Sequence, residues 1–282
     1  MKMDYNLKFL WMICLVAAMG GLLFGYDWVV IGGAKPFYEA FYELTGEDQA
    51  WRAGWAMSSA LVGCLLGALL SGAITDRIGR KKVLILAASM FVVSAIWTAL
   101  SNSYDSFILA RILGGIGIGL ASIVSPIYIA ELSPASMRGK FVSINQLTIV
   151  IGVLAAQIVN YLIYQNAPVE TDASTEVILN SWSGQTGWRW MFAAEAVPAG
   201  LFFLLALVIP ESPRWLLKRS RGEAARAILV KIGGESYADK EITEVEATLA
   251  GEHNVVHYSE LFHPRPLKIL GLGIFIAVVQ QW

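Results

Sequence analysis

The stretch GGLLFGYDW, residues 20–28, decides how this sequence is read, because it places an acid inside an apolar run. Apart from Asp27, residues 9–34 carry no charge, and Lys35 ends the run. A helix needs about 20 apolar residues to cross a hydrocarbon core that is roughly 30 Å thick. The run is therefore long enough to span a membrane, and Asp27 would lie within the span.

Five further runs with few or no charges have a comparable length. The composition agrees, since 56% of the 282 residues are hydrophobic and only 15% are charged, against about 25% charged residues in soluble domains. We therefore predict an all-α membrane protein with six complete spans. They are expected at residues 9–34, 54–75, 83–100, 107–130, 141–164 and 191–209.

A seventh span begins at residue 267 and reaches the last residue, 282. These 16 residues would make a helix about 24 Å long, so the terminal carboxylate would lie inside the bilayer at a high cost. We therefore expect the chain to be the front part of a longer protein. Three domains are predicted: a six-helix transmembrane domain at 1–210, a helical linker at 211–265 and the truncated seventh span at 266–282.

Basic residues indicate the orientation of the spans. Lys and Arg number 2, 4, 2 and 9 in the segments on the side of the N-terminus, and 2, 0 and 1 on the other side. Because cytoplasmic loops are enriched in Lys and Arg, this asymmetry predicts a cytoplasmic N-terminus and linker. The linker shows helical patterns at 213–218, 223–232 and 239–250, and we expect these helices to lie against the cytoplasmic ends of the spans.

A weak internal repeat relates spans one to three with spans four to six. Each triplet opens with a helix that combines several glycines with one ionisable residue, Asp27 in the first and Arg111 in the fourth. Two triplets of opposite topology would produce this pattern, which is found in transporters built from inverted repeats. The two cysteines, Cys14 and Cys64, lie within spans, where they indicate packing rather than a disulfide or a metal site.

Asp27, Arg111 and Glu195 are the ionisable residues well inside spans. Counting residues from the outer end of each span places all three roughly 8–13 Å below the outer surface, so they can meet. A lone charge at that depth costs at least about 2.5–3.5 kcal/mol, which favours a cluster around Arg111. Two acids share one guanidinium, so one acid could bind and release a proton, although a static salt bridge remains the alternative.

Taken in order, several motifs resemble the N-terminal half of the sugar porter family of the major facilitator superfamily. The resemblance covers the whole chain and is closest to bacterial D-xylose:proton symporters. It implies one half of a 12-helix fold and transport of a monosaccharide with a proton, by alternating access, across the cytoplasmic (inner) membrane. The motifs are GGLLFGYD (20–27), GAITDRIGRKK (72–82), RILGGIGIG (111–119), PIYIAELSPASMRG (126–139), NQL (145–147), GWRWM (187–191), PESPRWL (210–216) and QQ (280–281).

The resemblance assigns roles to residues in these motifs. Asp27, with Arg111 and Glu195, would couple proton uptake to sugar binding, because proton symporters of this family carry an acid at the position of Asp27. Residues of both signs at the cytoplasmic surface would form a gate that breaks when that side opens, although loop charges that set the topology are the alternative. The gate residues are Asp76, Arg77, Arg80, Glu131, Arg138, Glu211 and Arg214.

The family binds its sugar between the two halves of the protein, through polar side chains and aromatic faces. By position, Gln146, Gln280 and Gln281 match sugar ligands and Phe24 matches an aromatic wall. Glutamine suits this role because its amide both donates and accepts hydrogen bonds. Val153 stands where the xylose transporters carry a further polar ligand, which leaves the identity of the sugar open.

Other functions remain as alternatives. A passive sugar uniporter or a non-transporting sugar sensor could use the same scaffold. An enzyme is not expected, because no span contains a His and no nucleophile stands beside a base. The expected partners are a monosaccharide, a proton, the lipid bilayer and the missing C-terminal half, and no cofactor, metal or nucleic acid is expected.

Overall fold

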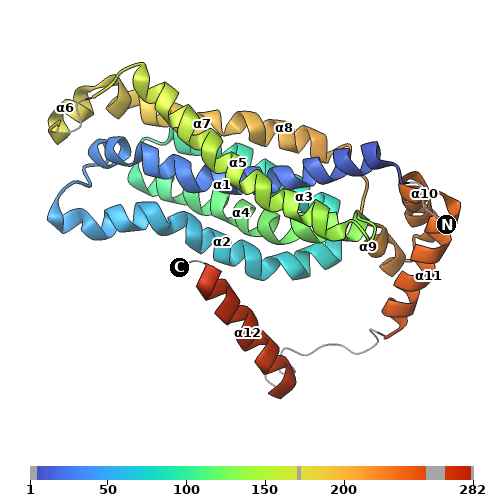
Figure 1. Ribbon diagram of the computed structural model, residues 1–282. Coiled ribbons are helices and arrows are strands. Elements are labelled where there is room, and N and C mark those ends of the chain that lie inside the picture. Colours follow the sequence, from blue (N-terminus) through green and yellow to red (C-terminus); the bar gives the residue numbers. More distant parts are fainter. Residues whose placement is uncertain (1–4, 170–172, 252–263, 281–282) are drawn as a thin grey trace. The chain divides into compact units, whose positions relative to one another are not determined.

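The computed structural model describes residues 5–169, 173–251 and 264–280 (Figure 1). Every regular element among these residues is a helix. Met1–Ala238 form one compact unit and Asp239–Trp282 a second, and each is described by itself. The main helices are α1 (Leu7–Phe41), α2 (Ala50–Ile78), α3 (Arg80–Leu100), α4 (Tyr104–Leu132), α5 (Arg138–Gln165), α6 (Thr175–Asn180), α7 (Trp188–Ala194), α8 (Ala196–Ala206), α9 (Pro213–Lys218), α10 (Gly222–Gly233), α11 (Glu235–Gly251) and α12 (Pro264–Gln280).

Six helical segments of the described chain are long and apolar enough to cross a membrane, which confirms the predicted number of spans. They are longer than the apolar runs, because a helix continues into the interfacial region where polar residues are tolerated. The first span, for example, runs through Pro36 to Phe41. The spans are Leu7–Phe41, Glu47–Ile78, Arg80–Leu100, Tyr104–Leu132, Arg138–Gln165 and Ser183–Ala206.

The sixth span is irregular. It opens with a π-helical turn at Ser183–Gly187, continues as α7 and is interrupted at Glu195 before α8. Pro198 lies three residues after Glu195 and has no N–H to donate to the carbonyl of Ala194, which explains the interruption. The buried acid therefore lies where the regular helical hydrogen bonding is interrupted, although its backbone keeps helical angles.

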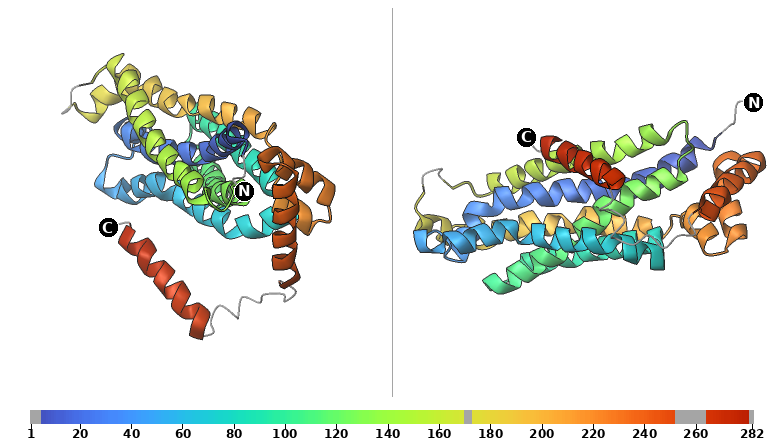
Figure 2. Two further views of the ribbon diagram at one scale, coloured as in Figure 1. Left: turned by 45° about the vertical axis from the view of Figure 1, so that its right-hand side comes forward. Right: turned by 90° about the horizontal axis from the view of Figure 1, so that it is seen from below.

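Two tight helix pairs hold the bundle together, α1 with α5 and α2 with α4 (Figure 2). At the first crossing, a Cβ atom on Gly25 would meet the carbonyl oxygen of Ile149. At the second crossing, a Cβ atom on Gly115 would meet the carbonyl oxygen of Ala60. Glycine therefore lets backbone approach backbone in both pairs, as in other membrane helix interfaces.

The two pairs are related by the predicted repeat. The first span packs on the fifth as the fourth packs on the second, which is the exchange expected for two inverted triplets. In addition, α3 packs on α4 and α8. The helix α4 is the most buried span, with 67% of its apolar window inside the bundle, against 22% for α5 and 28% for α2.

The end of the bundle where α1 finishes contains a cluster of aromatic side chains. Trp188, Phe107, Phe192 and Tyr38 are buried there. Arg189 lies against the cluster, with its Cζ atom 4.6 Å from the centroid of the Trp188 ring. Its Nη1 atom donates to the carbonyl oxygens of residues 99 and 101 at 2.8 and 2.6 Å. These carbonyls lie at the C-terminus of α3, where backbone oxygens lack helical partners.

At the opposite end, short helices follow the sixth span. The backbone N–H of Asn6 donates to the carbonyl oxygen of Ile232 at 2.8 Å, which joins the start of α1 to α10. The helix α9 packs against α4. Both helices therefore lie against the end of the bundle that carries the N-terminus, as expected for the linker. In the second unit, α12 is apolar but shorter than the six spans.

Candidate functional site

Asp27 and Arg111 form a paired ion bridge inside the membrane bundle. Arg111 on α4 donates through Nη1 and Nη2 to the two carboxylate oxygens of Asp27 on α1, the Nη2–Oδ2 distance being 2.9 Å. Asp27 is 3% exposed and Arg111 is 2% exposed. A bidentate Arg–carboxylate pair fixes both side chains and is strong in a medium of low polarity.

Packing of α1 on α4 brings the pair together. The face of the Phe192 ring lies against the guanidinium, with Cζ of Arg111 5.3 Å from the ring centroid. An aromatic face attracts a cation there without offering it a hydrogen bond. The Nε atom of Arg111 has no hydrogen-bond partner among the described residues.

Glu195 is the third buried ionisable residue predicted for this site. It is 3% exposed and lies close enough to Asp27 and Arg111 to interact electrostatically with both. However, its Oε1 atom has no hydrogen-bond partner within the described part of the chain. The three groups thus lie together, but the guanidinium bonds to Asp27 and not to Glu195, which contacts the pair through a side-chain hydrogen bond with Asp27 and through its charge interactions with both residues. These three residues are called the intramembrane cluster below.

A cavity of about 300 Å³ adjoins the Asp27–Arg111 pair of this cluster. Phe24, the predicted aromatic wall, lies in its lining together with Asp27 and Arg111. The structure therefore brings one predicted sugar residue and the buried pair to the same space. The remaining lining residues come from α1, α2 and α4: Trp28, Ile31, Met57, Ser58, Ala60, Leu61, Cys64 and Ile118.

Within the residues it describes, the structure does not place the predicted glutamine ligands in this cavity. Gln146 is exposed on α5 and does not line this cavity. Gln280 is the last residue of α12, which belongs to the second unit, and Gln281 lies outside the described residues. A role of these residues in sugar binding stays a prediction.

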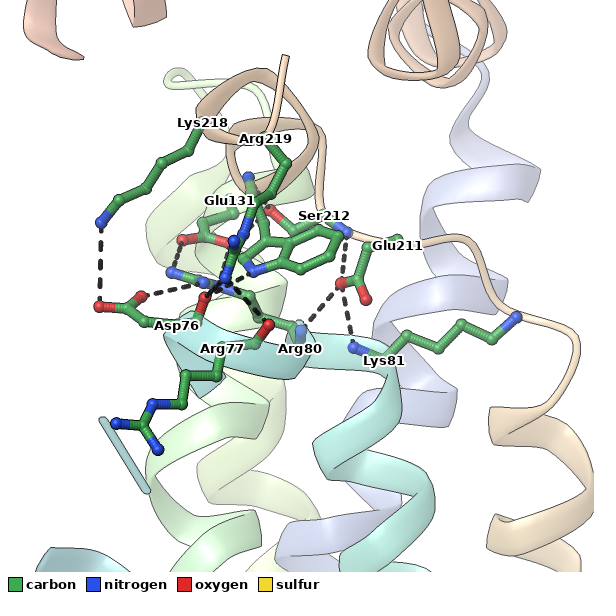
Figure 3. Close-up of polar contacts among 10 residues, drawn as sticks. Asp76, Arg77, Arg80, Lys81, Glu131, Glu211, Ser212, Lys218 and Arg219 are labelled. Atoms are coloured by element: carbon green, nitrogen blue, oxygen red, sulfur yellow. Dashed lines mark hydrogen bonds and ion pairs between the residues drawn. The ribbon is translucent and has the colours of Figure 1, made fainter. Parts of the chain in front are cut away.

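A second group of charges lies at the bundle end that carries the N-terminus (Figure 3). Arg80 bonds to both oxygens of Glu131, with Nε–Oε2 and Nη2–Oε1 distances of 3.0 and 2.9 Å. Its Nη1 atom also reaches Oδ1 of Asp76 at 3.3 Å. Glu211 accepts from the backbone N–H of Arg80, so four of the predicted gate residues meet here: Asp76, Arg80, Glu131 and Glu211.

Glu211 and Ser212 connect these charges to the segment after the sixth span. The Oε1 atom of Glu211 accepts from the backbone N–H groups of Arg80 and Lys81 at 2.9 and 3.0 Å, so it caps the first turn of α3. The hydroxyl of Ser212 donates to Oε2 of Glu131 at 2.5 Å. Asp76, Arg80, Glu131, Glu211 and Ser212 are called the surface cluster below.

Trp215 on α9, together with Lys218 and Arg219, which lie outside the quoted motifs, completes this region. Trp215 donates its indole N–H to the carbonyl oxygen of Asp76 at 3.1 Å, and Arg219 donates to the same oxygen and to that of Arg77 at 3.0 Å. Lys218 approaches the Asp76 carboxylate at 3.8 Å. The order Ser-Pro at residues 212–213, a helix-start signal, could have pointed to Ser212.

The surface cluster as defined does not include the other three predicted gate residues. The Arg77 side chain points away from it in Figure 3. Arg138 donates to the carbonyl oxygen of Ala130 at 3.0 Å, near the C-terminus of α4. Arg214 lies partly buried on α9. The gating role of the whole set stays a prediction.

Comparison with known proteins agrees with this architecture. Residues 13–282 match the family model described as "Sugar (and other) transporter". The chain is 39% identical over 278 residues to the arabinose-proton symporter of Bacillus subtilis, covering 99% of this chain and 56% of that protein. It is 40% identical over 280 residues to the glucose transport protein of a Synechocystis strain, covering 98% and 57%.

Among solved structures, the proton:xylose symporter XylE bound to 6-bromo-6-deoxy-D-glucose is similar, with a TM-score of 0.79 and 38% identity. The match covers 88% of this chain and 54% of that one. The chain thus spans a little over half the length of the curated relatives it matches. XylE belongs to the major facilitator superfamily, so the all-α bundle is the first half of that fold. The chain is a multi-pass membrane protein of the sugar transporter family.

Proposed function

We propose that the transporter containing this chain carries a monosaccharide across the cytoplasmic membrane together with a proton, by alternating access. The observation that supports this most directly is the intramembrane cluster beside a cavity that Phe24 also lines. Relatives named as arabinose–proton and proton:xylose symporters support the pairing of sugar with proton. Xylose is favoured among the sugars, but Val153 and the glucose-transporting relative leave other pentoses and hexoses open.

In the proposed cycle, a proton from the outer water reaches Asp27 through the cavity. Protonation removes the negative charge that holds Arg111, so the ion pair becomes a weaker hydrogen bond between a charged guanidinium and a neutral acid. Arg111 then shifts toward Glu195, a buried carboxylate with an unpaired oxygen. This change of partner loosens α1 from α4 and favours closure around bound sugar, and deprotonation on the inner side restores the bridge.

The surface cluster acts as the cytoplasmic gate in this proposal. Its contacts join α2, α3, α4 and the segment before α9. They therefore stiffen one side of the closed gate, which separates from the opposite bundle when the protein opens inward. The N-terminus and the linker at 211–265 lie in the cytoplasm, the domain at 1–210 forms one wall of the cavity, and residues 266–282 begin the second half.

Sugar binding is assigned to the space between the two halves. Phe24 supplies an aromatic face, and Gln146, Gln280 and Gln281 supply amides that can both donate to and accept from hydroxyl groups. Gln146 fits this role because its exposed position on α5 leaves it available to a ligand or to a second bundle.

The substitution Asp27→Asn in the full-length protein tests the proposal. The amide cannot take up a proton, so sugar accumulation driven by a proton gradient in vesicles should be abolished, while exchange of sugar across the membrane persists. Asp105→Asn, in the first turn of α4, is the matched control and should accumulate sugar normally. Accumulation by Asp27→Asn would remove the proton role, and absence of external alkalinisation on sugar addition to the wild type would indicate a uniporter instead.

A further inference from the structure

Trp28 has an unusual position on α1. It directly follows Asp27 and lies one helical turn after Phe24, so the two aromatic residues share a face. Trp28 is 57% exposed, and it is the exposed residue in an otherwise buried or half-buried stretch from Val16 to Ile31. A large exposed aromatic side chain in the middle of such a stretch calls for a ligand or a partner surface.

The cavity supplies the place for a ligand. Trp28 lines it beside Phe24 and Asp27, and Ser58 of α2 lines the same space. The indole N–H of Trp28 has no hydrogen-bond partner among the described residues, so it is available as a donor. The Ser58 hydroxyl donates to the carbonyl oxygen of Gly54 at 2.8 Å, which leaves its oxygen free to accept.

These groups match the chemistry of a monosaccharide. A sugar ring has C–H faces that pack on an aromatic ring and hydroxyl groups that need both donors and acceptors. Trp28 offers an apolar face and a donor in one rigid side chain, which is why tryptophan is common in binding sites that are partly wet. Met57 and Leu61, also in the lining, give apolar contact to the rest of the ring.

A different role is known for exposed tryptophans of membrane proteins, which is anchoring at the interface with lipid headgroups. Another exposed tryptophan of the chain, Trp190, serves as a comparison for Trp28. Trp190 on α7 is also 57% exposed but does not line the cavity. The two tryptophans thus have equal exposure and different surroundings.

We infer that Trp28 is a sugar-contacting residue, which extends the aromatic wall of Phe24 along α1 and lies next to the proton-binding acid. This inference rests on the proposed function. A sugar ring seated on Trp28 would lie over Asp27, whose small exposed fraction opens into the same cavity. The residue that follows the acid would therefore help to set both affinity and sugar preference.

Calorimetric titration of the full-length protein in detergent with arabinose, xylose and glucose tests the inference. Removing the indole in Trp28→Ala should weaken binding of the sugar that the wild type prefers about ten-fold, which equals about 1.4 kcal/mol. Trp28→Phe keeps an aromatic face and should stay within about three-fold of the wild type. Trp190→Ala, the matched control, should bind the sugar as the wild type does.

The outcomes separate the two proposals. If the wild type binds none of the sugars, the proposed function fails. If the wild type binds a sugar and Trp28→Ala binds it equally well, the inference on Trp28 is wrong. Equal losses in Trp28→Ala and Trp28→Phe, with a lower melting temperature in both, would indicate a packing role and would also overturn it.

A second measurement covers the case in which Trp28→Ala does not fold. Cys64 lines the same cavity and is partly exposed, whereas Cys14 is buried. In the wild type, saturating sugar should slow the alkylation of Cys64 by a small maleimide at least several-fold, as followed by mass spectrometry of its peptide. An unchanged rate would place the sugar away from this cavity and would refute contact with Trp28.

Discussion

Arg111 and Arg80 each hold a carboxylate through two nitrogen atoms, yet the two pairs differ in how completely their neighbours are bonded. At the surface cluster, both oxygens of Glu131 accept from Arg80, and one of them also accepts from Ser212. At the intramembrane cluster, Nε of Arg111 and Oε1 of Glu195 have no partner within the described residues.

The difference shows that a guanidinium–carboxylate pair can be fully bonded in one place and have unbonded neighbours in another. A buried polar network in which every atom is bonded is rigid, whereas an unpaired polar atom in a buried network is costly and would gain from a new partner. In the proposed cycle, the surface cluster therefore persists until the segment after the sixth span moves. In the same proposed cycle, the intramembrane cluster exchanges partners when one charge changes.

Removal of the shared guanidinium should have the largest effect. Arg111→Met would leave two buried carboxylates without a counter-charge, and breaking a buried pair in this way costs about 3–5 kcal/mol. The loss in unfolding free energy of the full-length protein can be measured by denaturant titration in detergent. The double variant Arg111→Met with Asp27→Asn should recover much of this loss, and no recovery would mean that the pair is not the cause.

At the surface cluster, a smaller loss is expected from Glu131→Gln. The amide keeps the shape but loses the charge, and its NH₂ group faces a donor of Arg80, which should cost about 1–2 kcal/mol of unfolding free energy. Asp76→Asn is the matched control. Its carboxylate is 56% exposed, so solvent screens its bond to Arg80 and the change should stay within about 0.5 kcal/mol. Equal losses in the two variants would contradict the contrast drawn between them.

The smallest effect on stability, and the opposite sign, is expected for Glu195→Gln. A neutral amide removes a buried carboxylate that stands beside Asp27 and has an unbonded oxygen. The free energy of unfolding should therefore stay within about 1 kcal/mol of the wild type or rise, because the change removes one of two acids that share a single guanidinium in a buried site. A clear fall in the melting temperature would show that Glu195 is held by bonds that stabilise the bundle.

The sequence was sufficient for the spans and for the proximity of the buried charges. Six apolar runs predict six helices because length and hydrophobicity alone decide whether a helix can cross a bilayer. Counting residues from the span ends also brought Asp27, Arg111 and Glu195 together. Which acid pairs with the guanidinium depends on the interruption at Glu195 and on helix packing, and neither is encoded in the residue count.

The surface cluster shows a second limit. Charged residues of both signs at short loops predicted contacts among Asp76, Arg80, Glu131 and Glu211, and these contacts are present. The carbonyl groups that end α2, however, bond to the side chains of Trp215 on α9 and of Arg219 just after it, about 140 residues further along the chain. Such contacts depend on tertiary geometry, and no local pattern in the sequence announces them.

The glycine crossings of α1 on α5 and of α2 on α4 have a consequence for motion. Where main chain touches main chain, there is no intervening layer of flexible side chains that could yield to sliding or rotation. Each helix pair should therefore move as one rigid body, and a rearrangement of the bundle must take place between the two pairs. Asp27 lies on α1 and Arg111 on α4, so their ion pair joins the two rigid pairs and must change when these pairs move relative to each other.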